Sequence, residues 1–351
     1  MTVRDYSLTG QSTRQALATG LAKAQWYRSP MTSSDMDLLT RRSDMPAIRD
    51  TLWYYGLMIV LAVAGIVLWP SWWSAPFWLA YATLYASGAD SRWHECGHRT
   101  AFKTRWMNQL VYQVACFCLL RNPVVWRRSH VRHHADTIIV GRDPEIITMR
   151  PPKLLKLFIL LLGWDTIEQW FKMFRYAVTG VNAEEASFIP EREHRDVQRI
   201  ARIWLAIFAA TVATALAMQS VLPFMVLFGP VIIGSWHYII TGLLQHTGMA
   251  DNVIDHRLNS RTVYMNPISR FVYWNMNYHV EHHMFPMVPY HQLPTLHEKI
   301  KADLPAANHS MAQGLAEVCL ALRKQLTDPE YRIEKPLPAG AQPYLTLQPP
   351  G

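Results

Sequence analysis

Four apolar stretches interrupt an otherwise mixed chain, and each approaches the length of a membrane-spanning helix. A bilayer core about 30 Å thick requires roughly 20 mostly apolar residues in a helix. The connections within the first pair and within the second pair are very short, so the pattern predicts two tight helical hairpins. The predicted spans are residues 52–69, 72–87, 200–218 and 221–244.

Aromatic and basic residues orient these predicted spans. Trp69, Trp72 and Trp73 lie at the first turn, where amphipathic rings favour the membrane–water boundary. Neither hairpin turn contains Lys or Arg, whereas the N-terminal region, the long middle segment and the C-terminal region are rich in both. Because cytosolic loops carry an excess of positive charge, those three parts are predicted to face the cytosol.

Two further apolar runs, residues 110–120 and 154–164, are much shorter than spanning requires, and we interpret them as interfacial or re-entrant helices. The expected fold class is an all-α integral membrane protein, with four transmembrane helices in two hairpins and a cytosolic helical cap. The expected regions are a cytosolic N-terminal region, 1–50; a membrane domain, 51–324; and a Pro-rich, disordered tail, 325–351.

Composition agrees with a membrane protein and argues against other classes. Hydrophobic residues make up 50% of the chain, yet the mean hydropathy is −0.01, as expected when apolar spans are averaged against a large polar part. The net charge of +8 is scattered among apolar runs without a nucleic-acid motif, so no nucleic-acid partner is expected. The four cysteines form no C-x-x-C pair, which argues against a cysteine-based zinc or iron–sulfur site.

Histidines carry the main chemical signal in the chain. Eight of the 15 fall in three compact groups. On a helix, spacings of three or four residues place side chains on one face, so each group is able to direct its imidazoles toward a common point. The groups are His94 and His98; His130, His133 and His134; and His279, His282 and His283.

The number of histidines bears on the number of metal ions. Neutral imidazole binds iron, zinc, copper and nickel, so the ligand type alone does not identify the metal. Eight ligands exceed what one ion uses, which leaves two ions, or one ion with spare histidines. Ligands meet only if they lie on one side of the bilayer, and four spans place all three groups on the cytosolic side. A fifth span at residues 154–164 would separate the third group from the others.

The motifs H-x-x-x-H, H-x-x-H-H and H-x-x-H-H, in this order around two hairpins, resemble the histidine boxes of the membrane fatty acid desaturase superfamily over about residues 93–286. The first box, which begins His94-Glu95-Cys96, is similar to that of oleate-type desaturases, and the residues from Trp126 to His130 are similar to the start of their second box. The family also tends to supply a further histidine ahead of the third box, and His246 resembles that element.

This resemblance implies two non-haem irons held almost wholly by histidine, with O2 as co-substrate and an external electron donor. The implied donor is a ferredoxin or cytochrome b5 type protein with an NAD(P)H reductase, because the chain shows no cluster motif, dinucleotide fingerprint or fused cytochrome segment. No catalytic residue beyond the ligands is expected. The implied ligands are His94, His98, His130, His133, His134, His246, His279, His282 and His283.

The expected function is the O2-dependent oxidation of a lipid acyl chain by a membrane oxidoreductase whose site faces the cytosol. Fatty acid desaturation is favoured, and hydroxylation by a member of the same superfamily is the alternative. Histidine spacing does not distinguish them, because the outcome depends on how the substrate is placed. Arg127 and Arg128 are candidates to bind a phosphate or carboxylate head group.

Two rival functions use the same residues. His94, Glu95 and His98 match H-E-x-x-H, in which two histidines bind zinc and the glutamate acts as general base. A membrane-embedded zinc metalloprotease would, however, leave the second and third groups without a role. A metal transporter or store is the other alternative, but transporters place polar ligands near the membrane midplane, and these groups lie outside the predicted spans.

Neighbouring residues complete the expected site. Metal-bound imidazoles usually donate their other N–H to a carboxylate or carbonyl, and the candidate partners are Asp90, Glu95, Asp136, Asp143, Asn277 and Glu281. His237 lies inside the fourth predicted span, which makes it a site hypothesis by default, although the family pattern includes no such residue. The other histidines are expected at the surface: His194, His256, His291, His297 and His309.

Overall fold

The computed structural model describes residues 4–344, and every regular element in that part of the chain is a helix. Extended pairing within those residues is limited to isolated bridges, from Thr262 to Tyr278 and from Val263 to Asn308. The predicted all-α class is therefore confirmed for the described part of the chain.

The described residues fall into two compact units. Unit 1 comprises residues 4–42, 128–154 and 240–344, and unit 2 comprises residues 43–127 and 155–239. The chain passes between the units within α7 (Pro123–Ala135) and within α14 (Ser235–His246). The expected regions 1–50, 51–324 and 325–351 rest on a different criterion and stay a prediction; residues 1–3 and 345–351 lie outside the described residues.

Two helices of unit 2 are long and apolar enough to cross a membrane, and they overlap the first and third predicted spans. One is α3 (Met45–Val67), and the other, Glu191–Ala217, consists of the turn η4 (Glu191–Glu193) and α11 (His194–Ala217). Their most apolar windows have mean hydropathies of 1.7 and 1.9, and only 17% and 11% of those windows are buried in the structure. Apolar side chains that face outward along a whole helix suit contact with lipid.

The second predicted span, residues 72–87, is helical but irregular. It contains the turn η2 (Trp72–Ser74), α4 (Ala75–Thr83) and a π-helical turn, η3 (Leu84–Gly88), which leads directly into α5 (Ala89–His98). The helical path therefore continues without a break from the apolar residues into the first histidine group. Such π-helical turns inside longer helices often occur near functional sites.

The fourth predicted span, residues 221–244, is broken into α12 (Leu222–Leu227), α13 (Gly229–Ile233) and most of α14. Pro223 and Pro230 stand in the first turns of α12 and α13. A proline has no N–H to continue the helical hydrogen-bond ladder, so Pro230 accounts for the break that ends α12. The four-span topology stays a prediction.

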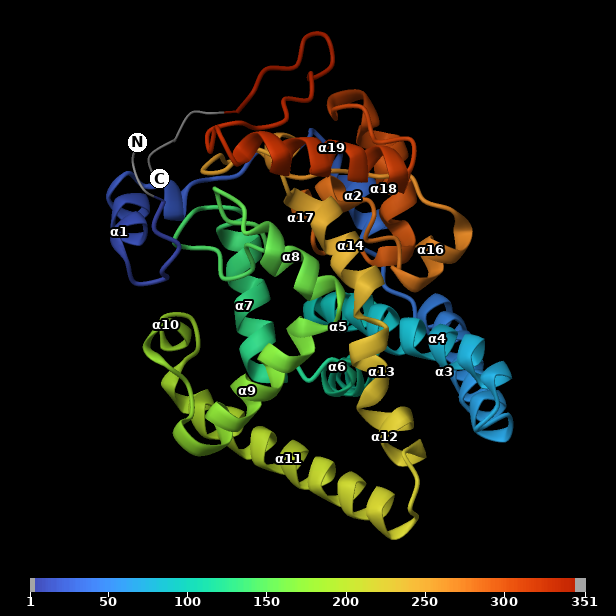
Figure 1. Ribbon diagram of the computed structural model, residues 1–351. Coiled ribbons are helices and arrows are strands. Elements are labelled where there is room, and N and C mark those ends of the chain that lie inside the picture. The colour runs from blue at the N-terminus through green and yellow to red at the C-terminus, as the bar shows by residue number, and fades with distance from the viewer. Residues whose placement is uncertain (1–3, 345–351) are drawn as a thin grey trace. The chain divides into compact units, whose positions relative to one another are not determined.

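Figure 1 shows the helix pairs that build unit 2. α3 packs against α4, α5 against α6 (Arg105–Cys118), and α9 (Trp164–Thr179) against α11. The two shorter apolar runs fall on α6, with 14 residues, and on α8 (Leu154–Leu161), with 8, so neither helix reaches spanning length. The remaining helix of this unit is α10 (Ala183–Ala186).

Unit 1 contains shorter helices joined by ordered turns, and most of the predicted metal ligands lie in it. A helix of only six residues, α17, supplies three of them. Within this unit α17 packs against α15 and α18. The helices are α1 (Gln11–Ala18), α2 (Ser33–Leu39), α15 (His256–Asn259), α16 (Pro267–Val272), α17 (His279–Met284), α18 (Leu293–Ile300) and α19 (Met311–Gln325).

Gly234 allows the start of α14 to approach α4 within unit 2. A Cβ atom at position 234 would lie 1.8 Å from the carbonyl oxygen of Ala82. Backbone rather than a flexible side chain blocks the added atom, so Gly234→Ala must push the two helices apart. We expect a loss of about 1–3 kcal/mol in the free energy of unfolding, measured as a lower thermal unfolding midpoint of the detergent-solubilised protein.

Gly56 in α3 provides the matched control, because a Cβ there would meet nothing within 4 Å. Gly56→Ala should leave the midpoint unchanged or raise it, since alanine favours a helix by up to about 1 kcal/mol over glycine. Equal midpoints for the two variants would contradict the close approach of Gly234 to Ala82.

Candidate metal centre

The third histidine group lies on α17, where every residue from His279 to Met284 is buried. Backbone hydrogen bonds hold both ends of the helix: the amide of His282 donates to the carbonyl of Tyr278, and the amide of Phe285 donates to the carbonyl of Glu281. Positions i, i+3 and i+4 of so short a helix share one face. The three imidazoles are therefore held together inside unit 1, as the spacing predicts.

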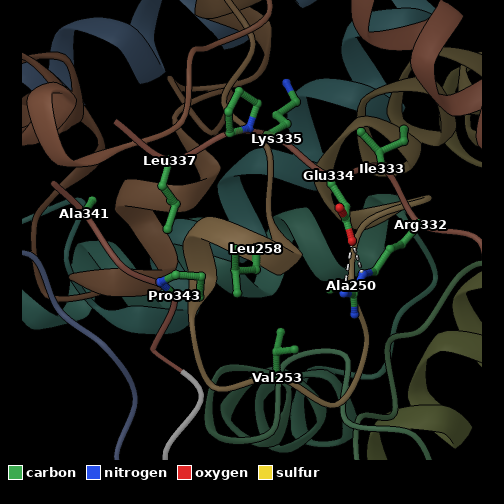
Figure 2. A pocket seen from close by; sticks show the side chains of 11 residues that line it. Ala250, Val253, Leu258, Arg332, Ile333, Glu334, Lys335, Leu337, Ala341 and Pro343 are labelled. Atoms are coloured by element: carbon green, nitrogen blue, oxygen red, sulfur yellow. Dashed lines mark hydrogen bonds and ion pairs between the residues drawn. The ribbon is translucent and has the colours of Figure 1, made fainter. Parts of the chain in front are cut away.

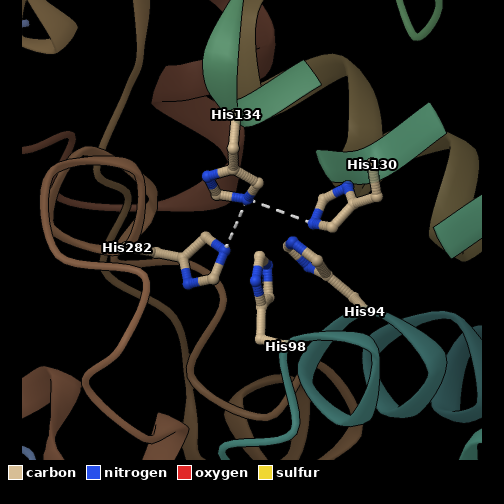
Figure 3. Close-up of side chains that lie close together, drawn as sticks. All are labelled: His94, His98, His130, His134 and His282. Atoms are coloured by element: carbon tan, nitrogen blue, oxygen red, sulfur yellow. Dashed lines mark hydrogen bonds between the residues drawn. The ribbon is translucent and has the colours of Figure 1, made fainter. Parts of the chain in front are cut away.

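The second histidine group lies on α7, and its imidazoles meet those of α17 within unit 1. Figure 3 shows His134 between His130 and His282: the Nε2 atom of His134 lies 3.1 Å from Nε2 of His130 and 3.2 Å from Nε2 of His282. Figure 3 also draws His94 and His98, which belong to unit 2. We call His130, His134 and His282 the first ligand group.

A second ligand group in unit 1 consists of His133, His246, His279 and His283. One ring nitrogen from each of these residues lies within 4.8 Å of the others. The Nε2 atom of His279 lies 3.0 Å from Nε2 of His246 and 3.0 Å from Nε2 of His283. Both ligand groups therefore combine residues of α7 and α17, and His246 at the end of α14 joins the second group.

Carboxylates orient the two histidines of α7 that face the following loop. Nδ1 of His133 lies 2.8 Å from Asp143, and Nδ1 of His130 lies 3.0 Å from Glu145. Asp143 also accepts the backbone amides of Ile138 and Glu145, each at 2.8 Å. Because an ionised carboxylate only accepts hydrogen bonds, each Nδ1 carries a proton and Nε2 is the atom left to bind a metal.

Neutral acceptors orient two members of the second ligand group in the same way. Nδ1 of His246 lies 2.9 Å from the carbonyl of Asn259, which can only accept. Nδ1 of His283 lies 3.2 Å from the hydroxyl of Thr137, whose own hydrogen is donated to the carbonyl of His133. His246 and His283 therefore also carry their proton on Nδ1, and Nε2 of each is a bare acceptor.

The pKa shifts of His246 and His283 agree with that assignment. Burial and the neighbouring His133 lower the pKa of His246 to about 3, and burial together with the adjacent imidazoles lowers the pKa of His283 well below its ordinary value. For His133, burial is the largest single influence and disfavours the charged form, but Asp143 and Glu145 together outweigh burial and raise the pKa. His246 and His283 are neutral near pH 7, as a metal ligand must be.

The second ligand group fits a metal cation better than it fits hydrogen bonds among its own members. Nε2 of His279 faces two bare Nε2 atoms, those of His246 and His283, at 3.0 Å each. A single N–H on His279 satisfies only one of those lone pairs, whereas a cation among the three nitrogens accepts all of them. Imidazole donors of this kind suit iron, zinc, copper or nickel.

Arg261 holds the turn that carries His246. Its guanidinium is 1% exposed and donates to the carbonyls of Leu244 and Thr247, each at 2.9 Å. These carbonyls belong to the end of α14 and the residue after it, where helical carbonyls lack partners in the helix itself. The amide of Ile333 then donates to the carbonyl of Gly248 at 2.7 Å, so a much later segment also fixes this turn.

The first histidine box lies on α5 of unit 2. His94 and His98 are one turn apart, with ring centroids 5.6 Å from each other. Asp90, in the first turn of this helix, accepts from Arg121 at 2.8 Å and from the indole N–H of Trp93 at 3.0 Å. Asp90 therefore anchors α5 through Arg121 and Trp93 rather than through a histidine.

Of the predicted hydrogen-bond partners of the ligands, Asp143 is confirmed and several others have different partners. Asp136 forms an ion pair with Arg142 at 2.9 Å. The amide group of Asn277 donates to the carbonyl of Val263 at 2.8 Å. Glu145, Thr137 and the Asn259 carbonyl were not predicted from the sequence. Of these three, only Glu145 was predictable, because it is a carboxylate two residues after Asp143 and close in the sequence to the second histidine group.

The expected surface position of His297 is wrong, because that residue is only 4% exposed. Its Nδ1 atom bonds to Glu281, and its Nε2 atom lies 2.8 Å from the hydroxyl oxygen of Tyr264. Glu281 accepts in addition from the hydroxyl of Thr262 at 2.6 Å. The glutamate of the third box thus ties α17 to α18 and does not contact the box's own histidines.

The expected surface position of His256 is also wrong. His256 is 2% exposed, and its ring stacks on Trp26 with centroids 4.2 Å apart and planes 6° apart. The ring centroid of His283 lies 5.1 Å from that of His256. His309 is exposed, as expected, while His194 and His291 are half-buried. Burial lowers the pKa of His256 to about 3, so this ring is neutral beside the ligands.

A cavity of about 600 Å³ lies elsewhere in unit 1, between the loop that contains Ala250 and Leu258 and the later segment that contains Leu337 (Figure 2). Its lining is largely apolar, with an Arg332–Glu334 ion pair at the rim. No histidine is among its described lining residues. The cavity is thus distinct from both ligand groups.

Comparison with known proteins is consistent with this chemistry. The sequence is similar to a temperature-sensitive sn-2 acyl-lipid omega-3 desaturase (ferredoxin), chloroplastic, of Arabidopsis thaliana, at 22% identity over 82% of the chain and 67% of that protein. It is 34% identical to an sn-1 oleoyl-lipid 12-desaturase of Synechocystis over 22% of each chain. It is 25% identical to fatty acid desaturase 3 of Bos taurus over 77% of the chain and 66% of that protein.

The chain thus spans from about a fifth to two thirds of the length of these relatives. The sequence model of the family described as fatty acid desaturase matches residues 69–314, which is more than half of the 351 residues. That range includes every predicted ligand. The chain therefore belongs to the fatty acid desaturase family of oxidoreductases.

Proposed function

We propose that this protein is a membrane di-iron enzyme that uses O2 to oxidise a lipid acyl chain, and that the reaction is fatty acid desaturation. One observation carries the proposal: in the second ligand group, Nε2 of His246 and Nε2 of His283 converge on His279 while their Nδ1 atoms are tied outward. Histidines with a purely structural role would not leave two bare Nε2 atoms facing a third nitrogen that is able to donate to only one of them. The family match supplies the choice of iron over other metals.

Nine histidines divide between two irons in this proposal. The second ligand group, His133, His246, His279 and His283, holds one ion. The first ligand group, His130, His134 and His282, holds the other, together with His94 and His98 of the first box. The spacing of His94 and His98 on one face of α5, and the place of that helix within the family match, support their inclusion.

The protein's own groups keep this site ordered. Asp143, Glu145, Thr137 and the Asn259 carbonyl hold the Nδ1 protons and so aim the Nε2 lone pairs inward. A bound iron pair supplies the O2-dependent chemistry that removes hydrogen from an unactivated methylene. Burial of α17 keeps water from its three imidazoles. Substrate methylenes held in an apolar tunnel would each contribute about 0.8 kcal/mol to binding.

The proposal also covers the membrane placement, the substrate and the electron donor. Four spans in two hairpins hold the protein in the membrane with both ligand groups on the cytosolic side, and α3 and α11 are the two helices whose length and hydropathy support this. The names of the relatives support an acyl-lipid substrate and a ferredoxin as donor. A cytochrome b5 type donor with an NAD(P)H reductase is the alternative. Arg127 and Arg128 remain candidates to bind the lipid head group.

The reaction itself is tested by expressing the chain in a host with a defined lipid profile and analysing fatty acids by mass spectrometry. We expect a new double bond with the wild-type chain and none with His133→Ala, because His133 is the member of the second ligand group that Asp143 orients. A new hydroxyl group would assign the chain to the hydroxylases of the superfamily. Unchanged lipids in a host that supplies iron and a working donor would contradict both reactions.

Asp143→Asn tests the outward hydrogen bonds directly. The variant replaces a carboxylate that accepts from His133 and from two backbone amides with a weaker, neutral acceptor. We expect iron affinity to fall by about 10–100-fold, measured as iron retained after dialysis against graded chelator concentrations. Asp136→Asn is the control, because that carboxylate pairs with Arg142. Equal iron retention in the two variants would count against the role of Asp143.

Glu95→Gln separates the oxidase from the zinc protease suggested by His94, Glu95 and His98. A zinc protease would lose essentially all turnover, because the glutamate is its general base. The oxidase is expected to keep more lipid-oxidising activity in Glu95→Gln than in His133→Ala, since Glu95 is not among the proposed ligands. Lipid oxidation that is lost equally in both variants would refute this expectation.

A further inference from the structure

We infer that electrons enter the site through Trp26 and His256, and that the surface around Trp26 docks an acidic one-electron carrier protein. The inference rests on the proposed di-iron function and adds the place and partner of electron delivery. Neither residue belongs to a histidine box, and neither is among the nine proposed ligands. Every residue that carries the argument belongs to unit 1.

A continuous series of rings runs from the surface to both ligand groups. Trp26 is partly exposed and stacks on the buried ring of His256, with centroids 4.2 Å apart. The next centroid, that of His283 in the second ligand group, lies 5.1 Å from His256. His283 in turn stacks on His134 of the first ligand group, with centroids 4.3 Å apart. Closely spaced aromatic rings provide electronic coupling from the protein surface to both ions.

Trp26 is fixed in this position by a polar contact as well as by stacking. Its indole N–H donates to the carbonyl of Ala135 at 3.0 Å. Ala135 is the last residue of α7 and directly follows His134. The amide of the next residue, Tyr27, donates to the carbonyl of Ile254 at 3.0 Å. The N-terminal segment is thus bound to both the helix and the loop that carry the rings.

The charges around Trp26 favour an acidic partner. Lys23 and Arg28 are exposed and flank Trp26 in the sequence, and Arg28 acts electrostatically on His256. Beside Ala135, Asp136 contacts Arg142 at 2.9 Å and Arg132 at 3.9 Å. Asp303 accepts from Tyr27 and Ser29, and Arg257, which lies over the ring of Tyr27, pairs with Asp303 and Asp255. With these groups included, five basic and three acidic groups sum to +2. A basic surface steers an acidic partner to its docking position.

Each delivery is a one-electron transfer. The carrier's reduced centre would lose one electron, and a ferric ion held by one ligand group would gain it and become ferrous, with no bond made or broken. Two such transfers would reduce an ion in each ligand group. Trp26 and His256 relay the electron and do not touch the substrate.

The docking surface is tested by binding. The probes are a plant-type [2Fe–2S] ferredoxin and a soluble cytochrome b5 domain, each titrated calorimetrically into the iron-loaded protein. Lys23→Glu with Arg28→Glu should weaken binding of the preferred carrier by about tenfold or more, with a weaker salt dependence. Arg323→Glu with Lys324→Glu is the control, because it makes the same charge change on exposed residues of α19. Equal binding by the two double variants, or wild-type binding of neither carrier, overturns the docking surface.

The ring relay is tested by a matched pair, Trp26→Phe and Trp26→Leu. Both lose the hydrogen bond to Ala135, but only phenylalanine keeps a ring against His256. At saturating carrier, the anaerobic oxidation of the reduced carrier, followed by stopped-flow absorbance, should be several-fold slower in Trp26→Leu than in Trp26→Phe. Equal rates in the two variants overturn the relay.

Two further measurements distinguish failure of the proposed di-iron function from failure of the relay. Iron content and reduction by dithionite, a small reductant that needs no docking surface, are measured for every variant. Full iron content and normal dithionite reduction in Trp26→Leu, with slow oxidation of the carrier, support the relay. A wild-type protein that holds no reducible iron overturns the di-iron function and the relay together, whereas normal reduction with unaltered carrier kinetics in the variants overturns the relay alone.

Discussion

The hydrogen bonds that hold the Nδ1 protons of the ligand histidines determine what unit 1 is able to do. Asp143, Glu145, Thr137 and the Asn259 carbonyl each hold one Nδ1 proton, and so direct Nε2 of the same imidazole into its ligand group. Without these contacts the same histidines could hydrogen-bond to one another in pairs, and the site would lose its affinity for a cation. The loop from Ile138 to Glu145 is shaped by the same carboxylate, because Asp143 accepts two backbone amides of this loop in addition to bonding His133.

The two units differ in which side chains they expose and which they bury. Unit 2 exposes whole apolar helices, such as α3, and contains a buried ion pair between Arg121 and Asp90. Unit 1 buries imidazoles and charged groups that are bonded to polar partners. Arg257, for example, forms ion pairs with Asp255 and Asp303. Removing one partner of such a buried pair costs far more than the pair contributes. The site is therefore embedded in a polar network that tolerates few substitutions.

Sequence reasoning recovered those parts of the site that depend on local spacing. The i, i+3 and i+4 positions of α7 and α17 were predictable, because a helix brings such residues together whatever surrounds it. His246 came from the family resemblance, since an isolated histidine has no local pattern. His256 and His297 were misjudged for the same reason: their partners, Trp26 and Glu281, are distant in the sequence. Pro230 indicated a break within residues 221–244, but the length of the apolar stretch led to the prediction of one continuous span.

The amide of Ile333 closes the turn behind His246 by donating to Gly248, and Lys335 reaches Glu317 and Asn308 nearby. These contacts have a consequence for biosynthesis. The turn that carries one ligand is completed by residues synthesised some eighty positions later, after both candidate spans have left the ribosome. All nine proposed ligands are therefore synthesised before the segment that closes the turn around His246, so a chain cut ahead of Ile333 would hold every one of those histidines and still lack this contact.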